Sequence, residues 1–174
     1  KISPPTIDAL DTSVEDEITV QWSIFDNVDE GRVEIYRSTD GSLGVLVAAL
    51  GDLSVTSWTD TGRDDGTEHF YTIRRVAPEA TADSDQASAV TLLPAPTDLE
   101  TTAVGPMTVD IAWTATHDTG DTRVEYKPTD EGTWNVSSTE DRTAETATID
   151  GLRTGEAYDI RVDAVTDDAE EVDQ

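Results

Sequence analysis

The chain contains no cysteine, which excludes disulfide bridges and thiolate metal sites. It also lacks any long apolar stretch: the longest, from Val45 to Leu50, is far shorter than the roughly 20 residues that a membrane-spanning helix needs. Aromatic residues make up 6% of the chain, and lysine occurs only at Lys1 and Lys127. We therefore expect modest cores and no membrane insertion.

The first residues, Lys1-Ile2-Ser3-Pro4-Pro5, include neither an initiator methionine nor a signal peptide. A chain that opens in this way is typical of a processed product or of a piece excised from a longer protein. We take it as one of these.

Basic residues are scarce, because 38 acidic residues stand against 11 basic ones and give a formal charge of −27. The excess is spread evenly: 18 acidic and 6 basic residues precede residue 93, and 20 and 5 follow it. Repulsion on this scale destabilises a compact state at low salt and is largely screened when molar salt shortens the Debye length to about 3 Å. The charge predicts a protein of a halophile and excludes nucleic-acid and anionic-membrane partners, which require basic patches.

An internal repeat sets the domain count. At an offset of 91 residues Trp22 aligns with Trp113, and Arg32-Val33-Glu34 aligns with Arg123-Val124-Glu125. Leu92-Leu93-Pro94-Ala95-Pro96 has the composition of a short, stiff linker. We predict two domains, residues 1–93 and 94–174.

Alternation of apolar and polar residues predicts half-buried strands in both repeats, separated by turn-forming segments. We see no credible amphipathic helix longer than two turns, so the predicted fold class is all-β with two consecutive sandwiches. The inward-facing residues expected from this alternation are Ile18, Val20, Trp22, Val33, Ile35, His69, Tyr71 and Ile73 in the first domain, and Val109, Ile111, Trp113, Val124, Tyr126, Tyr158, Ile160 and Val162 in the second.

These segments resemble the immunoglobulin-like fibronectin type III family. The second repeat supplies the tryptophan strand, an Arg-Val-Glu-Tyr strand and a strand that follows a leucine-x-x-glycine turn and carries Tyr158. Thr154 stands where the family usually has proline. The first repeat resembles the family's bacterial and viral branch through Tyr36-Arg37-Ser38-Thr39-Asp40-Gly41, Trp58-Thr59-Asp60-Thr61-Gly62 and Tyr71-Thr72-Ile73-Arg74-Arg75-Val76.

The resemblance implies a tyrosine corner, in which a tyrosine hydroxyl bonds back to the preceding backbone. Tyr158 fits that role in the second domain, whereas aligning Gly66 with Gly155 places His69 there in the first. The last family strand is expected at Ala87 to Leu92 in the first domain and is truncated or continued elsewhere in the second. We expect Trp22, Trp113, Tyr71 and Tyr158 to form structural core.

Candidate catalytic and cofactor-binding residues are not found. His69 is expected inside the first core and His117 in a solvated loop, and neither accompanies a nucleophile motif. Carboxylate pairs such as Asp64-Asp65, Asp167-Asp168 and Glu170-Glu171 follow from composition, without a calcium-loop pattern. We predict no enzyme, no cofactor and no metal.

Two features suggest surface roles. Asn135-Val136-Ser137 is a glycosylation sequon, so Asn135 is a candidate acceptor in an exported protein. Trp58 and Trp134 are candidates either for edge packing or for a carbohydrate-stacking surface. The expected loop at Pro78 to Asp85 has no Arg-Gly-Asp adhesion tripeptide, and Gly62-Arg63-Asp64 has the wrong order.

The resemblance and the charge together predict a non-catalytic structural or adhesive spacer. Its place would be a cell surface or a virion tail, baseplate or fibre of a halophilic archaeon or its virus. Partners would be other protein subunits of such an assembly, and possible partners include cell-surface glycans. The alternative is a set of accessory or carbohydrate-binding domains from a secreted hydrolase.

Overall fold

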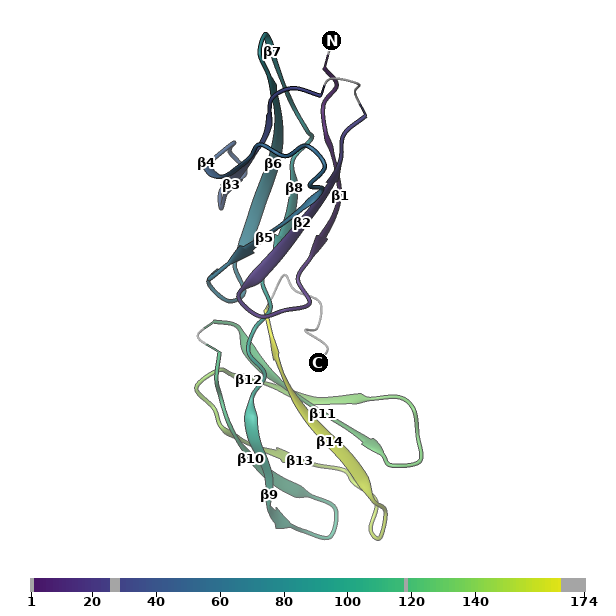
Figure 1. Cartoon of the computed structure of the whole chain (residues 1–174). Coiled ribbons are helices and arrows are strands. Elements are labelled where there is room, and N and C mark those ends of the chain that lie inside the picture. Colours follow the sequence, from purple (N-terminus) through teal and green to yellow (C-terminus); the bar gives the residue numbers. More distant parts are fainter. Residues whose placement is uncertain (1, 26–28, 118, 167–174) are drawn as a thin grey trace. The chain divides into compact units, whose positions relative to one another are not determined.

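The structure is a computed structural model that describes residues 2–25, 29–117 and 119–166. Every element in these residues is a β-strand, and every strand pairing is antiparallel, which confirms the all-β prediction. The chain divides into two compact units, residues 1–92 and 93–174. Figure 1 shows two facing layers of strands within unit 1 and within unit 2.

Unit 1 has a three-stranded sheet in the order β1-β2-β5 and a larger sheet in the order β4-β3-β6-β7, with β8 also paired to β6. Alternation places the apolar residues of β2 and β3 between the sheets, where they pack with Tyr71 and Ile73. The strands are β1 (Thr6–Asp11), β2 (Glu17–Ser23), β3 (Arg32–Ser38), β4 (Val45–Leu50), β5 (Ser57–Thr61), β6 (Glu68–Ala77), β7 (Ala80–Asp83) and β8 (Ala87–Val90).

Unit 2 repeats this plan with sheets in the orders β13-β10-β9 and β12-β11-β14. Its core contains Ile111, Trp113, Val124 and Ile149, with Tyr158 packed at the margin. The strands are β9 (Thr97–Val104), β10 (Val109–Thr114), β11 (Asp121–Pro128), β12 (Asn135–Asp141), β13 (Thr146–Ile149) and β14 (Tyr158–Val165).

The end of unit 1's chain differs from the sequence prediction. The segment expected to be an irregular loop contains β7, which extends the pairing of β6 and brings Asp83 opposite Arg74. The strand expected up to Leu92 ends at Val90. Ser84 lies between β7 and β8, which both pair with β6. It also bonds to β6, because its backbone N–H donates to Ile73 O and its Oγ accepts from Ile73 N. The residues after position 166, where a last strand of unit 2 was in question, lie outside the described residues.

A glycine precedes the central strand in each unit because the backbone passes close to the neighbouring strand. A Cβ on Gly31, whose φ is 114°, would lie 1.9 Å from Val76 O, and one on Gly120, whose φ is 80°, would lie 2.2 Å from Val165 O. In unit 1 the buried Arg75 guanidinium fixes this approach by donating to Val76 O and Glu30 O at 2.8 and 3.0 Å. Each central strand therefore starts at a point that only glycine allows.

Candidate functional site

The two histidines lie in different units. His69 on β6 faces the core and is 4% exposed, as the alternation predicted. Burial, followed by the charge of Arg37, lowers the pKa of His69 below its ordinary value. His117 was expected in solvent, which is wrong: it is 4% exposed, and its Nε2 lies 3.5 Å from Oγ1 of the fully buried Thr122.

The tyrosine corner is present in unit 2, where the Tyr158 hydroxyl accepts a hydrogen bond from Arg153 N at 3.0 Å. In unit 1 the glycine-based alignment placed His69 at this position. The strand register corrects it, because Glu34 pairs with Arg74 as Glu125 pairs with Arg161. Tyr71 lies three residues before Arg74 on β6, and Tyr158 lies three residues before Arg161 on β14. Tyr71, not His69, is therefore the residue of unit 1 that is equivalent to Tyr158.

Tyr71 makes a different bond from Tyr158. Its hydroxyl donates to Asp60 Oδ2 at 2.8 Å, and this carboxylate also accepts from Arg37 Nη1 at 2.9 and 2.7 Å. Arg63 Nε lies 3.4 Å from Asp60 Oδ1. Asp60 belongs to β5, while Arg37 and Tyr71 belong to the facing sheet, so this buried cluster joins the two layers of unit 1. Burial, assisted by the bond to Asp60, holds the pKa of Tyr71 well above its usual range.

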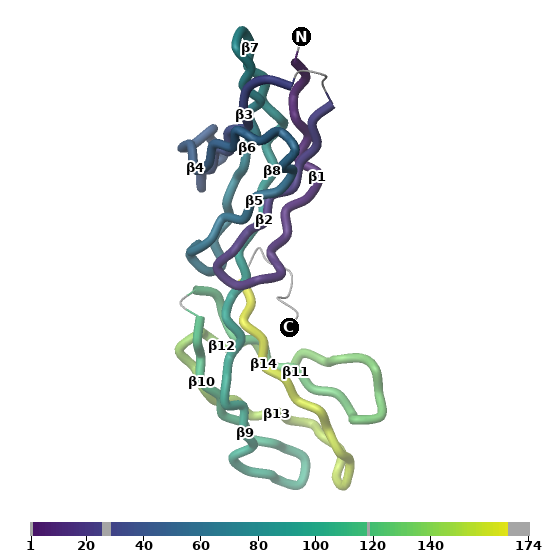
Figure 2. Tube along the Cα trace, viewed as in Figure 1, coloured from purple at the N-terminus to yellow at the C-terminus, as the bar shows by residue number. Residues whose placement is uncertain are grey.

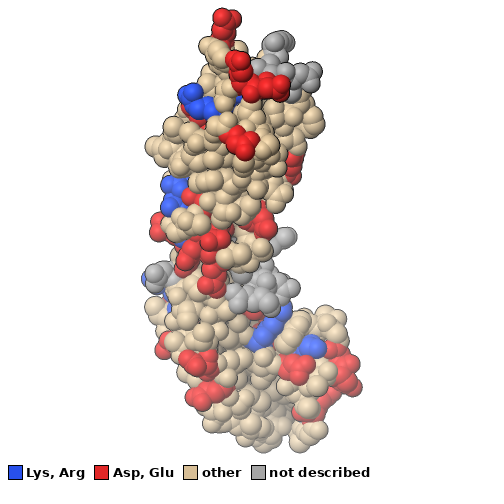
Figure 3. All heavy atoms as spheres, in the orientation of Figure 1, with Lys and Arg blue, Asp and Glu red and all other residues tan. Residues whose placement is uncertain are grey.

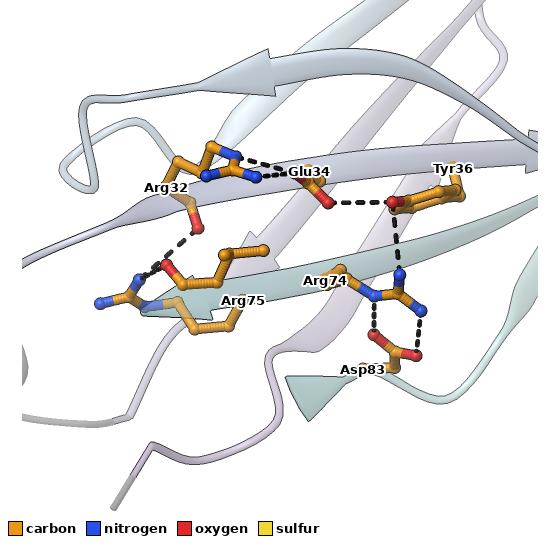
Figure 4. Close-up of polar contacts among 7 residues, drawn as sticks. Arg32, Glu34, Tyr36, Arg74, Arg75 and Asp83 are labelled. Atoms are coloured by element: carbon orange, nitrogen blue, oxygen red, sulfur yellow. Dashed lines mark hydrogen bonds and ion pairs between the residues drawn. The ribbon is translucent and has the colours of Figure 1, made fainter. Parts of the chain in front are cut away.

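A second polar chain covers the outer face of the larger sheet in unit 1 (Figure 4). Arg32 Nε donates to Glu34 Oε1 at 2.7 Å, and the Tyr36 hydroxyl donates to Glu34 Oε2 at 2.9 Å. Arg74 Nη1 lies 3.3 Å from that hydroxyl, and its Nε and Nη2 hold Asp83 at 2.6 and 2.8 Å. Burial by itself would raise the pKa of Glu34, but the bonds from Tyr36 and Arg32 outweigh it and lower that pKa.

The matching face of unit 2 also carries a buried glutamate, Glu125. Arg161 on β14 lies across from Glu125 on β11 and binds it at 2.7 Å, and Arg123 lies 3.7 Å from the same carboxylate. Arg161 also contacts Asp163 at 3.2 Å. Burial, followed by the hydrogen bond and charge of Glu125, raises the pKa of Asp163 to about 6. In both units the glutamate of the repeated Arg-Val-Glu sequence is thus buried and paired with arginine: Glu34 with Arg32 of its own strand, and Glu125 with Arg161 of the next strand.

The sequence argument did not select Glu34, Glu125 or Asp60. An acidic residue in an alternating strand is normally assigned to solvent, and in a chain with 38 acidic residues no single one stands out. The available signal was the repetition of arginine two positions before glutamate in both units.

Trp134 extends the polar face of unit 2. The Arg161 guanidinium carbon lies 4.6 Å and the Lys127 Nζ 5.2 Å from the centre of its ring, distances typical of cation–π contacts. Lys127 also lies 3.3 Å from Asp159, and the neighbouring Val136 is 57% exposed. Trp58, the other candidate, packs against the core of unit 1 from β5. Of these two tryptophans, Trp134 is the one that makes cation–π contacts among the described residues.

The remaining candidates do not gather into a site. Asn135 is exposed at the start of β12, where its amide donates to Tyr126 O at 3.4 Å. Asp64 and Asp65 lie between β5 and β6, while Asp167-Asp168 and Glu170-Glu171 lie outside the described residues. Among the residues that the structure describes, no three histidine or carboxylate side chains group as metal ligands. Within the same residues, no helix is long and apolar enough to cross a membrane.

Ion pairs use most of the basic side chains and leave the surface with an excess of acidic ones. Carboxylates of the same unit lie within ion-pair distance of the basic groups of Arg32, Arg37, Arg63, Arg74, Arg123, Lys127, Arg153 and Arg161. Many more acidic residues remain than these pairs use. Figure 3 accordingly shows acidic side chains at many points of the visible face of each unit and few basic ones.

Comparisons with known proteins agree with this geometry. Residues 94–173 match the family model of the fibronectin type III domain. No curated protein matches the chain significantly. Among solved structures, a segment of two fibronectin type III domains from chicken tenascin is 17% identical with a TM-score of 0.62, and the match covers 98% of this chain and 97% of that one.

A second solved structure, the FN1–FN3 domains of chicken CNTN1, is 11% identical with a TM-score of 0.42. That match covers 95% of this chain and 64% of the other. In sequence, residues 94–173 are therefore similar to the fibronectin type III domain, and the chain as a whole has an all-β fold like that of two such domains in succession.

Proposed function

We propose that this chain is a non-catalytic structural and adhesive spacer in an extracellular or virion assembly of a halophilic archaeon or its virus. The observation that carries the proposal is the distribution of charge: most of the basic groups are paired with carboxylates of their own unit, and many more acidic residues remain in contact with solvent. Such a surface suits a protein that stays folded and soluble in brine and makes weak contacts through many copies.

The proposed partners are other protein subunits of that assembly. A spacer of this kind needs two folded units and accessible loops, and individual contacts gain strength when many copies bind together. The tail, baseplate or fibre of a virus and the cell envelope are the settings that fit. Nucleic acid and anionic membranes are not proposed as partners, because binding them depends on basic patches.

Localisation tests this function. Antibodies against the two units, used for immunogold labelling of intact cells and of purified virions, should label an outer surface. Fractionation of the same material should place the protein with envelope or virion. Recovery of the protein solely from the cytoplasm, with no label on either surface, would reject the proposal.

Carbohydrate binding is the second candidate function, and Trp134 is the observation that favours it. An aromatic ring next to Lys127, Arg161 and the exposed Val136 offers an apolar contact together with hydrogen-bond donors. A glycan array probed in molar salt with the full chain would test it. Binding that is lost in Trp134→Ala and retained in Trp58→Ala would favour an accessory carbohydrate-binding role, and absence of binding by the wild type would remove it.

A further inference from the structure

Strand β4 has an open edge. It lies at the margin of the sheet β4-β3-β6-β7, and within the described residues it pairs only with β3. Figures 1 and 2 both show β4 on the outer side of unit 1. No described strand pairs with the backbone groups on its other side, so they form an edge that is a template for another strand.

The side chains of this edge are unusual for the protein. No charged residue occurs from Gly41 to Gly51, although 28% of the chain is charged. Within this segment Leu43, Val45 and Leu46 are 39%, 63% and 49% exposed. An exposed, apolar and uncharged edge strand is the kind that natural proteins usually protect.

In unit 2 the corresponding edge strand is protected against pairing by polar and charged side chains. Its strand β12 occupies the corresponding margin of the sheet β12-β11-β14. Most of its residues are polar, and it ends in Glu140 and Asp141, charges that discourage pairing with another edge. The same topological position is therefore blocked in unit 2 and open in unit 1.

We propose that β4 pairs antiparallel with β4 of a second copy of this chain, so that one sheet continues through two copies. An antiparallel pair of identical strands is self-complementary and closes with two-fold symmetry. Two copies that each carry −27 repel wherever acidic surfaces meet, and β4 brings no charge to the contact. A basic partner would gain more from the acidic surface elsewhere, which favours a second copy as the occupant.

The size of the contact sets its strength. A single pair of six-residue strands buries far less than the roughly 1,600 Å² of a standard stable interface. The dimer should therefore be weak and reversible, as suits a contact repeated along an assembly. Because salt screens the repulsion between the two copies, association should strengthen as salt concentration rises. This inference does not depend on the proposed location of the protein.

Sedimentation equilibrium of the full chain, over a concentration series in dilute buffer and in molar potassium chloride, tests the pairing. The wild type should form a monomer–dimer equilibrium that shifts toward dimer in molar salt. Val45→Glu should remain monomeric, because it places a carboxylate from each copy at the shared edge. Ala49→Glu, at another exposed position of β4, should also remain monomeric. It replaces Val45→Glu if circular dichroism shows that the Val45→Glu variant does not fold.

Val136→Glu is the matched control, because it changes a valine of similar exposure on the corresponding strand of unit 2. It should dimerise like the wild type. A wild type that stays monomeric at the highest concentration in molar salt would overturn the proposal. Dimers that survive both β4 substitutions, or that are lost in Val136→Glu, would show that another surface makes the contact.

Discussion

His69 is a titratable side chain placed where no charge can be accommodated at low cost. The structure gives neither ring nitrogen a hydrogen-bond partner among the described residues, and the ring is 4% exposed. Burial and the nearby Arg37 both lower its pKa from the ordinary value of 6.5. The unfolded chain therefore binds a proton at a pH at which the folded chain still resists it.

Unit 1 should accordingly lose stability as pH falls below about 6.5, where the unfolded histidine becomes protonated. Urea unfolding in molar salt between pH 7.5 and pH 5 should show this loss. His69→Leu, which keeps an apolar group in the core, should remove that part of the slope. A slope that is the same in the variant and the wild type would mean that His69 is accessible to protons in the folded state.

The raised pKa of Asp163 predicts that the stability of unit 2 depends on pH in the opposite direction. Burial and Glu125 raise its pKa to about 6 in the folded state, above the ordinary 3.8. Folding then favours the protonated form, so this contribution is present below about pH 4 and is lost as pH rises through about 6. At neutral pH the folded chain carries the cost of an ionised Asp163 beside Glu125.

Asp163→Asn removes that cost and should raise the unfolding midpoint of unit 2 at pH 7.5, with a smaller difference at pH 5. Glu156→Gln, near the tyrosine corner of the same unit, is a suitable control because the carboxylate lies outside the Glu125 cluster. The expectation fails if Asp163→Asn destabilises unit 2 at both pH values, because Asp163 would then act mainly as a partner of Arg161.

At the scale of whole elements, the alternation along β2, β3, β6, β10 and β14 was enough to predict which residues face the cores. This works because a strand with one buried face imposes a period of two on the sequence. Strand β7 was missed because Ala80–Asp83 lacks that period, and its pairing depends on the length of β6. The polar chains on Glu34 and Glu125 were missed because alternation assigns a residue to the outer face without showing which neighbours will bury it.

Trp113 tests the assignment of β10. Its ring is 4% exposed and packs in the core of unit 2 with Ile111, Val124 and Ile149. Trp113→Ala leaves a large cavity and should cost about 3 to 5 kcal/mol of unfolding free energy, enough to unfold many small domains. Trp134→Ala, on the half-buried outer face, should cost clearly less. Urea denaturation followed by circular dichroism would compare them, and equal losses would contradict the placement of Trp113 in the core.

At the scale of the whole molecule, charge falls into two classes. The carboxylates of Asp60, Glu34 and Glu125 are buried and held by arginines, so salt has little access to them. Most other acidic residues face solvent, where their mutual repulsion opposes folding and responds to salt. Salt should therefore remove repulsion while leaving the buried pairs largely intact.

The melting temperature of the full chain should rise steeply from dilute buffer to molar potassium or sodium chloride, as the Debye length falls from tens of ångströms to about 3 Å. A variant with Glu100→Gln and Asp130→Asn, two exposed positions in unit 2, should melt higher than the wild type in dilute buffer and gain less from salt. Scanning calorimetry at several salt concentrations gives both quantities. An unchanged melting temperature across this range would show that surface repulsion is not what limits the fold, and the assignment to a halophile would lose its physical basis.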